Sequence, residues 1–117
     1  MERPQERVVD LGGQLCPRFQ LAAELVGKRW TGAIVQTLIS GPCRFNELLA
    51  RVTGVSDRLL SERLRELEGV GIVKREVSSG PPVRVTYELT CSGHELEPVV
   101  RALEQWAERW ITLESLG

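Results

Sequence analysis

Residues 54–90 read GVSDRLLSERLRELEGVGIVKREVSSGPPVRVTYELT, and this stretch decides the fold. Ser56 is a suitable N-cap for a helix, because its hydroxyl can accept a hydrogen bond from a free backbone N–H, and Asp57 in the first turn suits the helix dipole. Three leucines recur at helical spacing and predict a buried stripe: Leu60, Leu64 and Leu67. Gly69 and Gly71 tolerate a positive φ, so they predict the end of this helix.

Two strands are expected after this helix. The first is predicted over residues 72–77, and the cluster Ser-Ser-Gly-Pro-Pro at 78–82 is typical of a turn. Apolar and polar side chains alternate through residues 83–89, which predicts a half-buried strand. The two strands therefore form a β-hairpin.

Three shorter patterns at helical spacing precede this stretch. Pro17 suits the first turn of a helix, which we expect over residues 17–27. Residues 30–38 carry a second apolar stripe that Gly41-Pro42 ends, and residues 45–52 carry a third. The chain therefore has further helices on the N-terminal side of the deciding stretch.

A long helix is predicted over residues 92–113. Ser92 and Glu95 have the spacing of a capping box, and Thr90 is a competing N-cap. The apolar face of this helix is wider than one small domain can cover, so we expect a second copy to bury part of it. The side chains expected there are Val99, Leu103, Trp106 and Trp110.

The element order is four helices, two strands and a last helix. This order predicts a mainly α fold with a small β-hairpin (α+β), a winged helix-turn-helix. We expect residues 1–15 to form a flexible N-terminal arm and residues 16–117 to form a single domain.

Charge and composition exclude several classes of protein. The net charge is −1, but residues 1–93 hold 13 Lys or Arg against 11 Asp or Glu, whereas residues 94–117 hold 2 against 5. This asymmetry favours a DNA-facing part and a separate acidic part. No apolar run approaches the roughly 18 residues of a membrane span. Residues 1–15 lack the layout of a secretory signal, so we expect a cytoplasmic protein.

The three cysteines indicate neither a disulfide framework nor a metal site. They stand at positions 16, 43 and 91, an odd number without a C-x-x-C pair. No Gly-rich phosphate loop or base-and-nucleophile set is present, which argues against a thiol-based enzyme. We therefore expect no catalytic residue, no cofactor and no metal.

One face of the helix that is predicted to begin after Ser56 is polar. Arg58, Ser61, Glu62 and Arg65 recur at i, i+3, i+4 and i+7, and their side chains can bond base edges or phosphates. The alternative is a solvated face with pairs such as Arg58–Glu62. Lys74, Arg75 and Arg84 flank the hairpin and can neutralise phosphates.

Several motifs together resemble the HxlR-type winged-helix regulators, a bacterial and archaeal group related to the MarR type. The similarity lies in CPRFQLAAELVGKRWTGAIVQTLISGPCRFNEL, in GVSDRLLSERLRELEGVGIVKRE and in PPVRVTYELTCSGHEL. These motifs run in one order from Cys16 to Trp110. The resemblance implies a recognition helix over 56–65, a wing over 78–84, and dimerisation helices over about 17–27 and 92–113.

The resemblance assigns roles to individual residues. Double-stranded DNA is the implied partner, with contacts from Ser56, Asp57, Arg58, Ser61, Glu62, Arg65, Arg75, Ser78, Ser79 and Arg84. A homodimer is implied, with an interface that includes Phe19, Val99, Leu103, Trp106 and Trp110. Cys16 matches a cysteine that several members of the family use as a thiol sensor.

Two interpretations of Cys16 remain open at the level of sequence. A cysteine just before a helix, with Arg18 nearby, is expected to favour the thiolate. The other interpretation is a small residue that packs near the dimer seam. Cys43 and Cys91 are fillers or resolving thiols, and His94 stands alone in a helix cap.

The sequence thus predicts a DNA-binding transcriptional regulator that acts as a homodimer on a roughly palindromic operator, with a redox or electrophile response through Cys16. The alternative is a winged-helix module that binds proteins and not DNA, which the near-neutral charge supports. A thiol-based enzyme is the third interpretation. A salt-dependent shift on DNA separates the first from the others.

Overall fold

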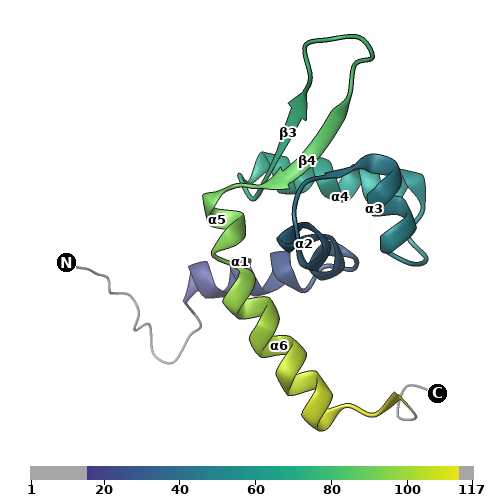
Figure 1. Ribbon diagram of the computed structural model, residues 1–117. Coiled ribbons are helices and arrows are strands. Elements are labelled where there is room, and N and C mark those ends of the chain that lie inside the picture. The colour runs from purple at the N-terminus through teal and green to yellow at the C-terminus, as the bar shows by residue number, and fades with distance from the viewer. Residues whose placement is uncertain (1–15, 114–117) are drawn as a thin grey trace.

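The computed structural model describes residues 16–113, so the arm predicted over 1–15 lies outside the described residues. The elements, in order, are α1 (Pro17–Val26), α2 (Thr31–Ile39), β2 (Cys43–Arg44), α3 (Phe45–Arg51), α4 (Asp57–Gly69), β3 (Val73–Val77), β4 (Val85–Leu89), α5 (Cys91–His94) and α6 (Glu97–Trp110). The β3–β4 hairpin projects from one end of the molecule and α6 from the other (Figure 1). The predicted order of four helices, a hairpin and C-terminal helix is confirmed.

The core lies between α2, α3, α4 and the base of the sheet. Its largest fully buried side chains are Ile34, Leu38, Leu48, Leu60, Leu64 and Leu67. Three of these are the leucines of the deciding stretch, so their helical spacing predicts the buried face of α4 correctly. Val73 and Leu89 close the core from the hairpin side.

The ends of α4 follow local rules. Ser56 Oγ accepts a hydrogen bond from the backbone N–H of Leu59 at 3.1 Å, as expected of an N-cap. At the other end Gly71 has φ +81°, which a side chain would oppose. Gly69 was expected to share this role, but it is the last helical residue and lacks a positive φ. Only Gly71 provides the turn into β3.

The sheet has three strands in the order β2-β4-β3, and all neighbours are antiparallel. Strand β2 escapes sequence analysis because two residues are too few to show alternation. It pairs Cys43 with Tyr87 and Arg44 with Thr86. Both hairpin strands begin later than predicted, at Val73 and Val85. At the start of β3 this is because Ile72 still donates its N–H to Leu67 O at the end of α4.

The single helix predicted over 92–113 is wrong, because the chain forms two helices there. Thr90, not Ser92, is the N-cap of α5, and its Oγ1 accepts from the N–H of Gly93. Ser92 Oγ instead donates to Gly71 O at 2.9 Å. Pro98 in the first turn of α6 lacks an N–H and cannot continue the ladder from α5. Helix α6 then ends at Trp110.

Candidate nucleic-acid interface

Helix α4 presents a polar face opposite its buried leucines. Ser56, Asp57, Arg58 and Arg65 are exposed, whereas Ser61 and Glu62 are half-buried. The structure therefore brings the six predicted residues of this segment onto or beside one accessible surface. The first residues of the helix, Asp57 and Arg58, are exposed together with the N-cap Ser56.

The charged groups of this face differ in their partners. Arg65 Nη2 donates to Ser61 Oγ at 3.3 Å, and Glu62 lies 3.8 Å from Nη1 of Arg63. Within residues 16–113, neither Arg58 nor Asp57 has a side-chain hydrogen bond or ion pair. The Arg58–Glu62 pair considered as an alternative does not form. Arg58 thus keeps its donors available to a ligand.

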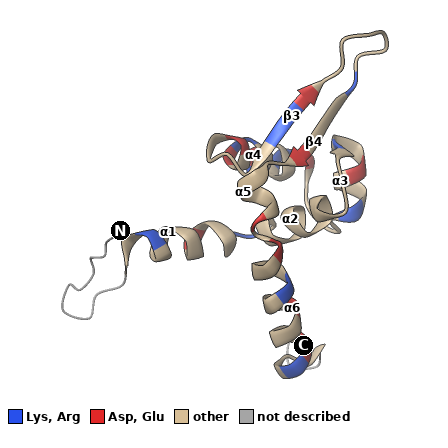
Figure 2. Cartoon of the chain, turned by 60° about the vertical axis from the view of Figure 1, so that its left-hand side comes forward, with Lys and Arg blue, Asp and Glu red and all other residues tan. Residues whose placement is uncertain are grey.

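The wing separates its cations by face. Lys74 Nζ lies 3.1 Å from Glu88 Oε2 and 3.7 Å from Glu76 Oε2, and the hydrogen bond to Glu88 raises the pKa of Lys74. Its charge is therefore compensated within the hairpin, by one carboxylate from each strand. Arg75 pairs with Tyr87 in the ladder and lies on the opposite face of the hairpin, because successive residues alternate. Figure 2 shows both signs of charge along the hairpin.

The outer wing is held by a serine. Ser78 donates its N–H to Arg84 O at 2.8 Å, and Ser78 Oγ accepts from the N–H of Arg84 at 2.8 Å. Ser78 therefore stabilises the outer end of the wing, in addition to its predicted contact with DNA. Ser79 and the Arg84 side chain are exposed at the tip. Along the part of the chain that the structure describes, Arg75 and Arg84 form no ion pair.

Arg44 is a cation that sequence reasoning missed. It is exposed in β2, beside Thr86 of the wing strand, and its backbone N–H donates to Glu47 Oε1 at 2.7 Å. Its nearness to the wing follows from the pairing of β2 with β4, which no local pattern indicates. By this register Arg44 lies on the same face of the sheet as Lys74 and Glu76, opposite to Arg75, and adds an exposed arginine there.

Helices α1 and α6 leave most of their apolar side chains uncovered. None of the residues of α1 is buried, and Val100 is the buried residue of α6. The predicted interface residues are all accessible: Phe19 62%, Val99 48%, Leu103 59%, Trp106 55% and Trp110 62% exposed. Leu21 and Ile111 are exposed beside them and were not predicted.

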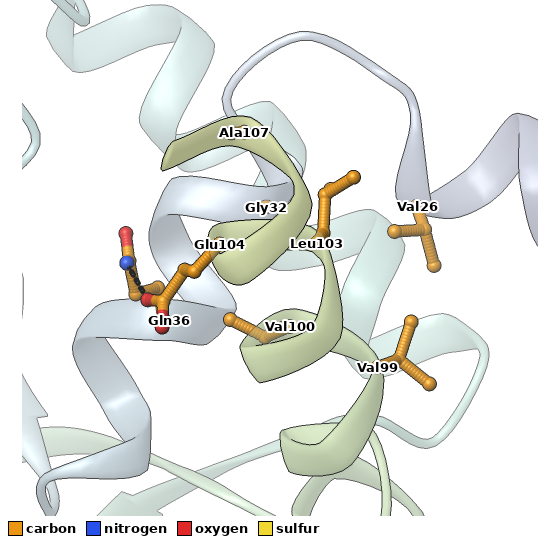
Figure 3. A pocket seen from close by; sticks show the side chains of 8 residues that line it. All are labelled: Val26, Gly32, Gln36, Val99, Val100, Leu103, Glu104 and Ala107. Carbon is orange, nitrogen blue, oxygen red and sulfur yellow. Dashed lines mark hydrogen bonds between the residues drawn. The ribbon is translucent and has the colours of Figure 1, made fainter. Parts of the chain in front are cut away.

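An apolar cavity of about 230 Å³ separates α6 from α2 (Figure 3). Its walls include Val26, Val99 and Leu103, and Gln36 closes one side by donating a hydrogen bond to Glu104. Helix α6 packs on the rest of the domain mainly through α2. Its exposed face is correspondingly accessible to a partner.

The three cysteines occupy different environments. Cys16 is exposed directly before α1, where the backbone N–H groups of Phe19 and Arg18, aided by the Arg18 charge, hold the pKa of its thiol below the usual value. Burial raises the pKa of Cys43, whose Sγ lies 3.8 Å from Arg51 Nη1. Cys91 is exposed at the start of α5. All three are free thiols.

The described residues form neither a metal site nor a membrane span. Among residues 16–113, no group of three His, Cys, Asp or Glu side chains is arranged to hold a metal ion. No helix in this range has the length and apolar content required to cross a bilayer.

Comparison with known proteins places this geometry in context. The family described as HxlR-like helix-turn-helix matches residues 25–115. The chain is 45% identical over 98 residues to the uncharacterized HTH-type transcriptional regulator YvaP of Bacillus subtilis (strain 168), which covers 84% of this chain and 91% of that protein. It is 40% identical over 100 residues to the HTH-type transcriptional regulator YodB of the same organism, over 86% of this chain and 89% of YodB.

Solved structures agree with these sequence relatives. The reduced form of YodB matches with a TM-score of 0.77 over 84% of this chain and 96% of that chain, at 40% identity. YodB is also known in a diamide-treated form (TM-score 0.72, 40% identity, 84% and 97% covered) and a quinone-bound form (0.72, 38%, 82% and 100%). The redox regulator HypR in its oxidized form matches with a TM-score of 0.77 at 37% identity, over 84% and 100% of the two chains. The predicted winged helix-turn-helix fold is thereby confirmed.

Proposed function

Because the chain belongs to the HxlR-like helix-turn-helix family of transcriptional regulators, we propose that it binds duplex DNA as a homodimer at a roughly palindromic operator. Family membership also confirms the resemblance indicated by the sequence motifs and the expectation that the chain is not an enzyme. The observation that carries the proposal is the exposed face of α4, whose Arg58 has no partner within the described residues.

Helix α4 is the element that reads bases in this proposal. A helix fits the major groove, and its N-terminal side chains reach deepest. Arg58 is available for a bidentate contact with guanine, and Arg65 can exchange its bond to Ser61 for a base edge or phosphate. The wing and β2 supply backbone contacts through Arg75, Arg84 and Arg44.

The net charge of −1 does not oppose DNA binding, because the charges are unevenly placed. Lys74 is compensated by Glu76 and Glu88, and Arg101 by Glu97 and Glu104 on α6. Among the described residues, the arginines without a carboxylate partner include Arg58 on α4, Arg75 and Arg84 on the wing and Arg44 on β2. A local positive surface is sufficient for phosphate contacts.

The uncovered helices support the proposed homodimer. Single exposed apolar residues are ordinary, but α6 presents four on one face, with Phe19 and Leu21 exposed on α1. Two copies related by a two-fold axis would cover these residues and present two α4 helices to one duplex. Half-sites about one or two helical turns apart are then expected.

Cys16 is the proposed sensor of oxidants or electrophiles. Its exposure on the single chain and its lowered pKa favour reaction of the thiolate, whereas packing at the dimer seam is the alternative that the Cys16→Ser variant tests. The relatives YodB and HypR are known in chemically distinct states, which is consistent with a thiol-linked response.

The direct experiment selects bound sites from a pool of genomic fragments and measures affinity for the selected site at several salt concentrations. We expect one enriched palindrome and a log affinity that falls linearly with log salt. The alternative, a protein-interaction module without DNA binding, predicts no enrichment and no salt-dependent shift. That result would refute the proposal.

A further inference from the structure

The loop of residues 27–30, between α1 and α2, is hydrogen-bonded to α4 on the side of the helix away from Arg58 and Arg65. Arg63 Nε donates to the backbone carbonyl of Arg29 at 2.9 Å, and its Nη1 lies 3.4 Å from Glu66 Oε2. Lys28 Nζ lies 3.0 Å from the same Glu66 oxygen. The Arg63 side chain is only 12% exposed, unlike the cations of the DNA-facing surface. A nearly buried guanidinium therefore joins α4 to a loop more than 30 positions away in the sequence.

Trp30 gives the same loop a second contact with the helix-turn-helix unit. Its Cη2 lies so near Gly54, in the turn before α4, that a Cβ there would approach it to 3.2 Å. Trp30 has φ 77°, in the left-handed region that residues other than glycine rarely adopt. Arg29 covers the ring, with its Cζ 4.8 Å from the ring centroid. The surroundings thus hold this loop in one defined shape.

Helix α1 runs directly into this loop, and α1 is one of the two helices with uncovered apolar side chains. In a dimer whose interface is formed by α1 and α6, this loop is the segment of chain that leads from the interface helix α1 towards α4. A rigid connection at this step fixes where each α4 lies relative to its copy. Duplex DNA is stiff and its half-sites recur every 10–10.5 base pairs, so the separation of the two helices selects the half-site spacing.

We propose that Arg63 is a positioning residue that locks α4 to the loop 27–30 and thereby sets the half-site spacing that the dimer accepts. This inference rests on the proposed function, since it requires a dimer that binds two half-sites. It assigns Arg63 no contact with DNA. Helical spacing places it away from Arg58 and Arg65, on the side of α4 that faces the loop.

The test varies the operator and not only the protein. The selected palindrome is remade with one or two base pairs added to or removed from its centre, and the affinity for each duplex is measured. For the wild-type protein we expect a sharp optimum. In Arg63→Ala we expect the ratio between the best spacing and its neighbours to fall about fivefold, the lower end of typical coupling between distant sites.

Two further variants separate positioning from charge and from stability. Arg63→Lys keeps the charge but lacks the planar fork that spans the Arg29 carbonyl and Glu66, so its spacing profile is also expected to flatten. Arg101→Ala is the matched control, because Arg101, like Arg63, contacts two carboxylates of its own helix, but within residues 16–113 it has no bond to another element comparable to that of Arg63 with the Arg29 carbonyl. Its profile is expected to stay sharp.

The outcomes are distinct. A purely structural role for Arg63 lowers the thermal midpoint and weakens every spacing alike, and an unchanged spacing ratio in both Arg63 variants overturns the inference. If Arg63→Ala does not fold, Arg63→Lys decides the question alone. A wild-type protein that prefers no spacing contradicts the proposed homodimeric function itself, and the inference is then rejected with it.

Discussion

Arg58 and Arg65 lie two turns apart on one exposed face of α4, yet they differ in what they already bind. Arg65 donates to Ser61, whereas Arg58 has no partner within residues 16–113. Seven residues of helix separate the two Cα atoms by about 10 Å along the axis. This length matches about three base pairs of a duplex, so both guanidinium groups can reach one half-site.

Substitution of either arginine by alanine tests the reading face. We expect Arg58→Ala to weaken operator binding by roughly 1–3 kcal/mol and to relax the preference at one base pair, because a bidentate contact is lost. Arg65→Ala should cost less, since Arg65 must first give up its bond to Ser61. Affinities for the operator and its single-base variants are the measurement. Equal affinity in both variants and the wild type would mean that DNA docks elsewhere.

The wing arginines are expected to act without sequence preference. Arg75→Ala and Arg84→Ala should each weaken all duplexes alike and reduce the slope of log affinity against log salt by about one unit, as loss of one phosphate contact requires. Lys74→Ala is the matched control, because Glu76 and Glu88 already compensate Lys74. A slope change in the control as large as in the two arginine variants would contradict this assignment.

The sequence predicts α4 and the hairpin well because their signals are local: the Ser56 cap, the leucine spacing and the alternation before Leu89. It does not predict β2, since Cys43 and Arg44 become a strand only through pairing with β4. It does not predict the break before α6 either, although Pro98 provides a signal. Whether a cation of the sheet is paired with a carboxylate depends on residues of the neighbouring strand. Lys74 is an example, because its nearest carboxylate is that of Glu88 on β4.

Gly93 in α5 leads to a stability prediction. A Cβ at this position would clash with the backbone oxygen of Ile72 and lie within 3.1 Å of the Leu89 side chain. Gly93→Ala should therefore lower the free energy of unfolding by about 1–3 kcal/mol or more, although alanine favours helices. Gly69→Ala is the control, with open space around it in α4 and an expected gain of about 0.5–1 kcal/mol. Denaturant unfolding measures both, and a stabilised Gly93→Ala would contradict the contact.

The uncovered face of α6 gives the prediction for assembly. Leu103→Glu and Trp106→Glu place a carboxylate where a second copy is expected to pack, so both should shift sedimentation from dimer to monomer at micromolar concentration. Both side chains are exposed on the single chain, so the helical content should remain. Gln105→Glu adds the same charge on the opposite side of α6 and should stay dimeric. A wild-type protein that sediments as a monomer at all concentrations would refute the dimer.

The reactivity of the Cys16 thiol is expected to depend on pH differently from that of an ordinary cysteine. Because backbone N–H groups and Arg18 lower its pKa, the thiolate persists to lower pH than in an ordinary cysteine, and its reactivity falls only as pH drops through that lowered pKa. Rates of alkylation by iodoacetamide, followed at each cysteine by mass spectrometry, should show the lowest midpoint at Cys16 and slow reaction at Cys43, whose pKa burial raises.

The same thiolate is expected to control DNA binding. Peroxide converts it to a sulfenic acid, and diamide takes two electrons and two protons from two thiols to form one disulfide, so either reagent changes bulk or linkage where α1 begins. A small rotation of α1 would change the separation of the two α4 helices, which a stiff duplex penalises. Operator affinity should therefore change on oxidation of the wild type and remain constant in Cys16→Ser. If both proteins respond alike, Cys16 is not the sensor, and Cys91, the other exposed thiol of the described chain, becomes the candidate to substitute next.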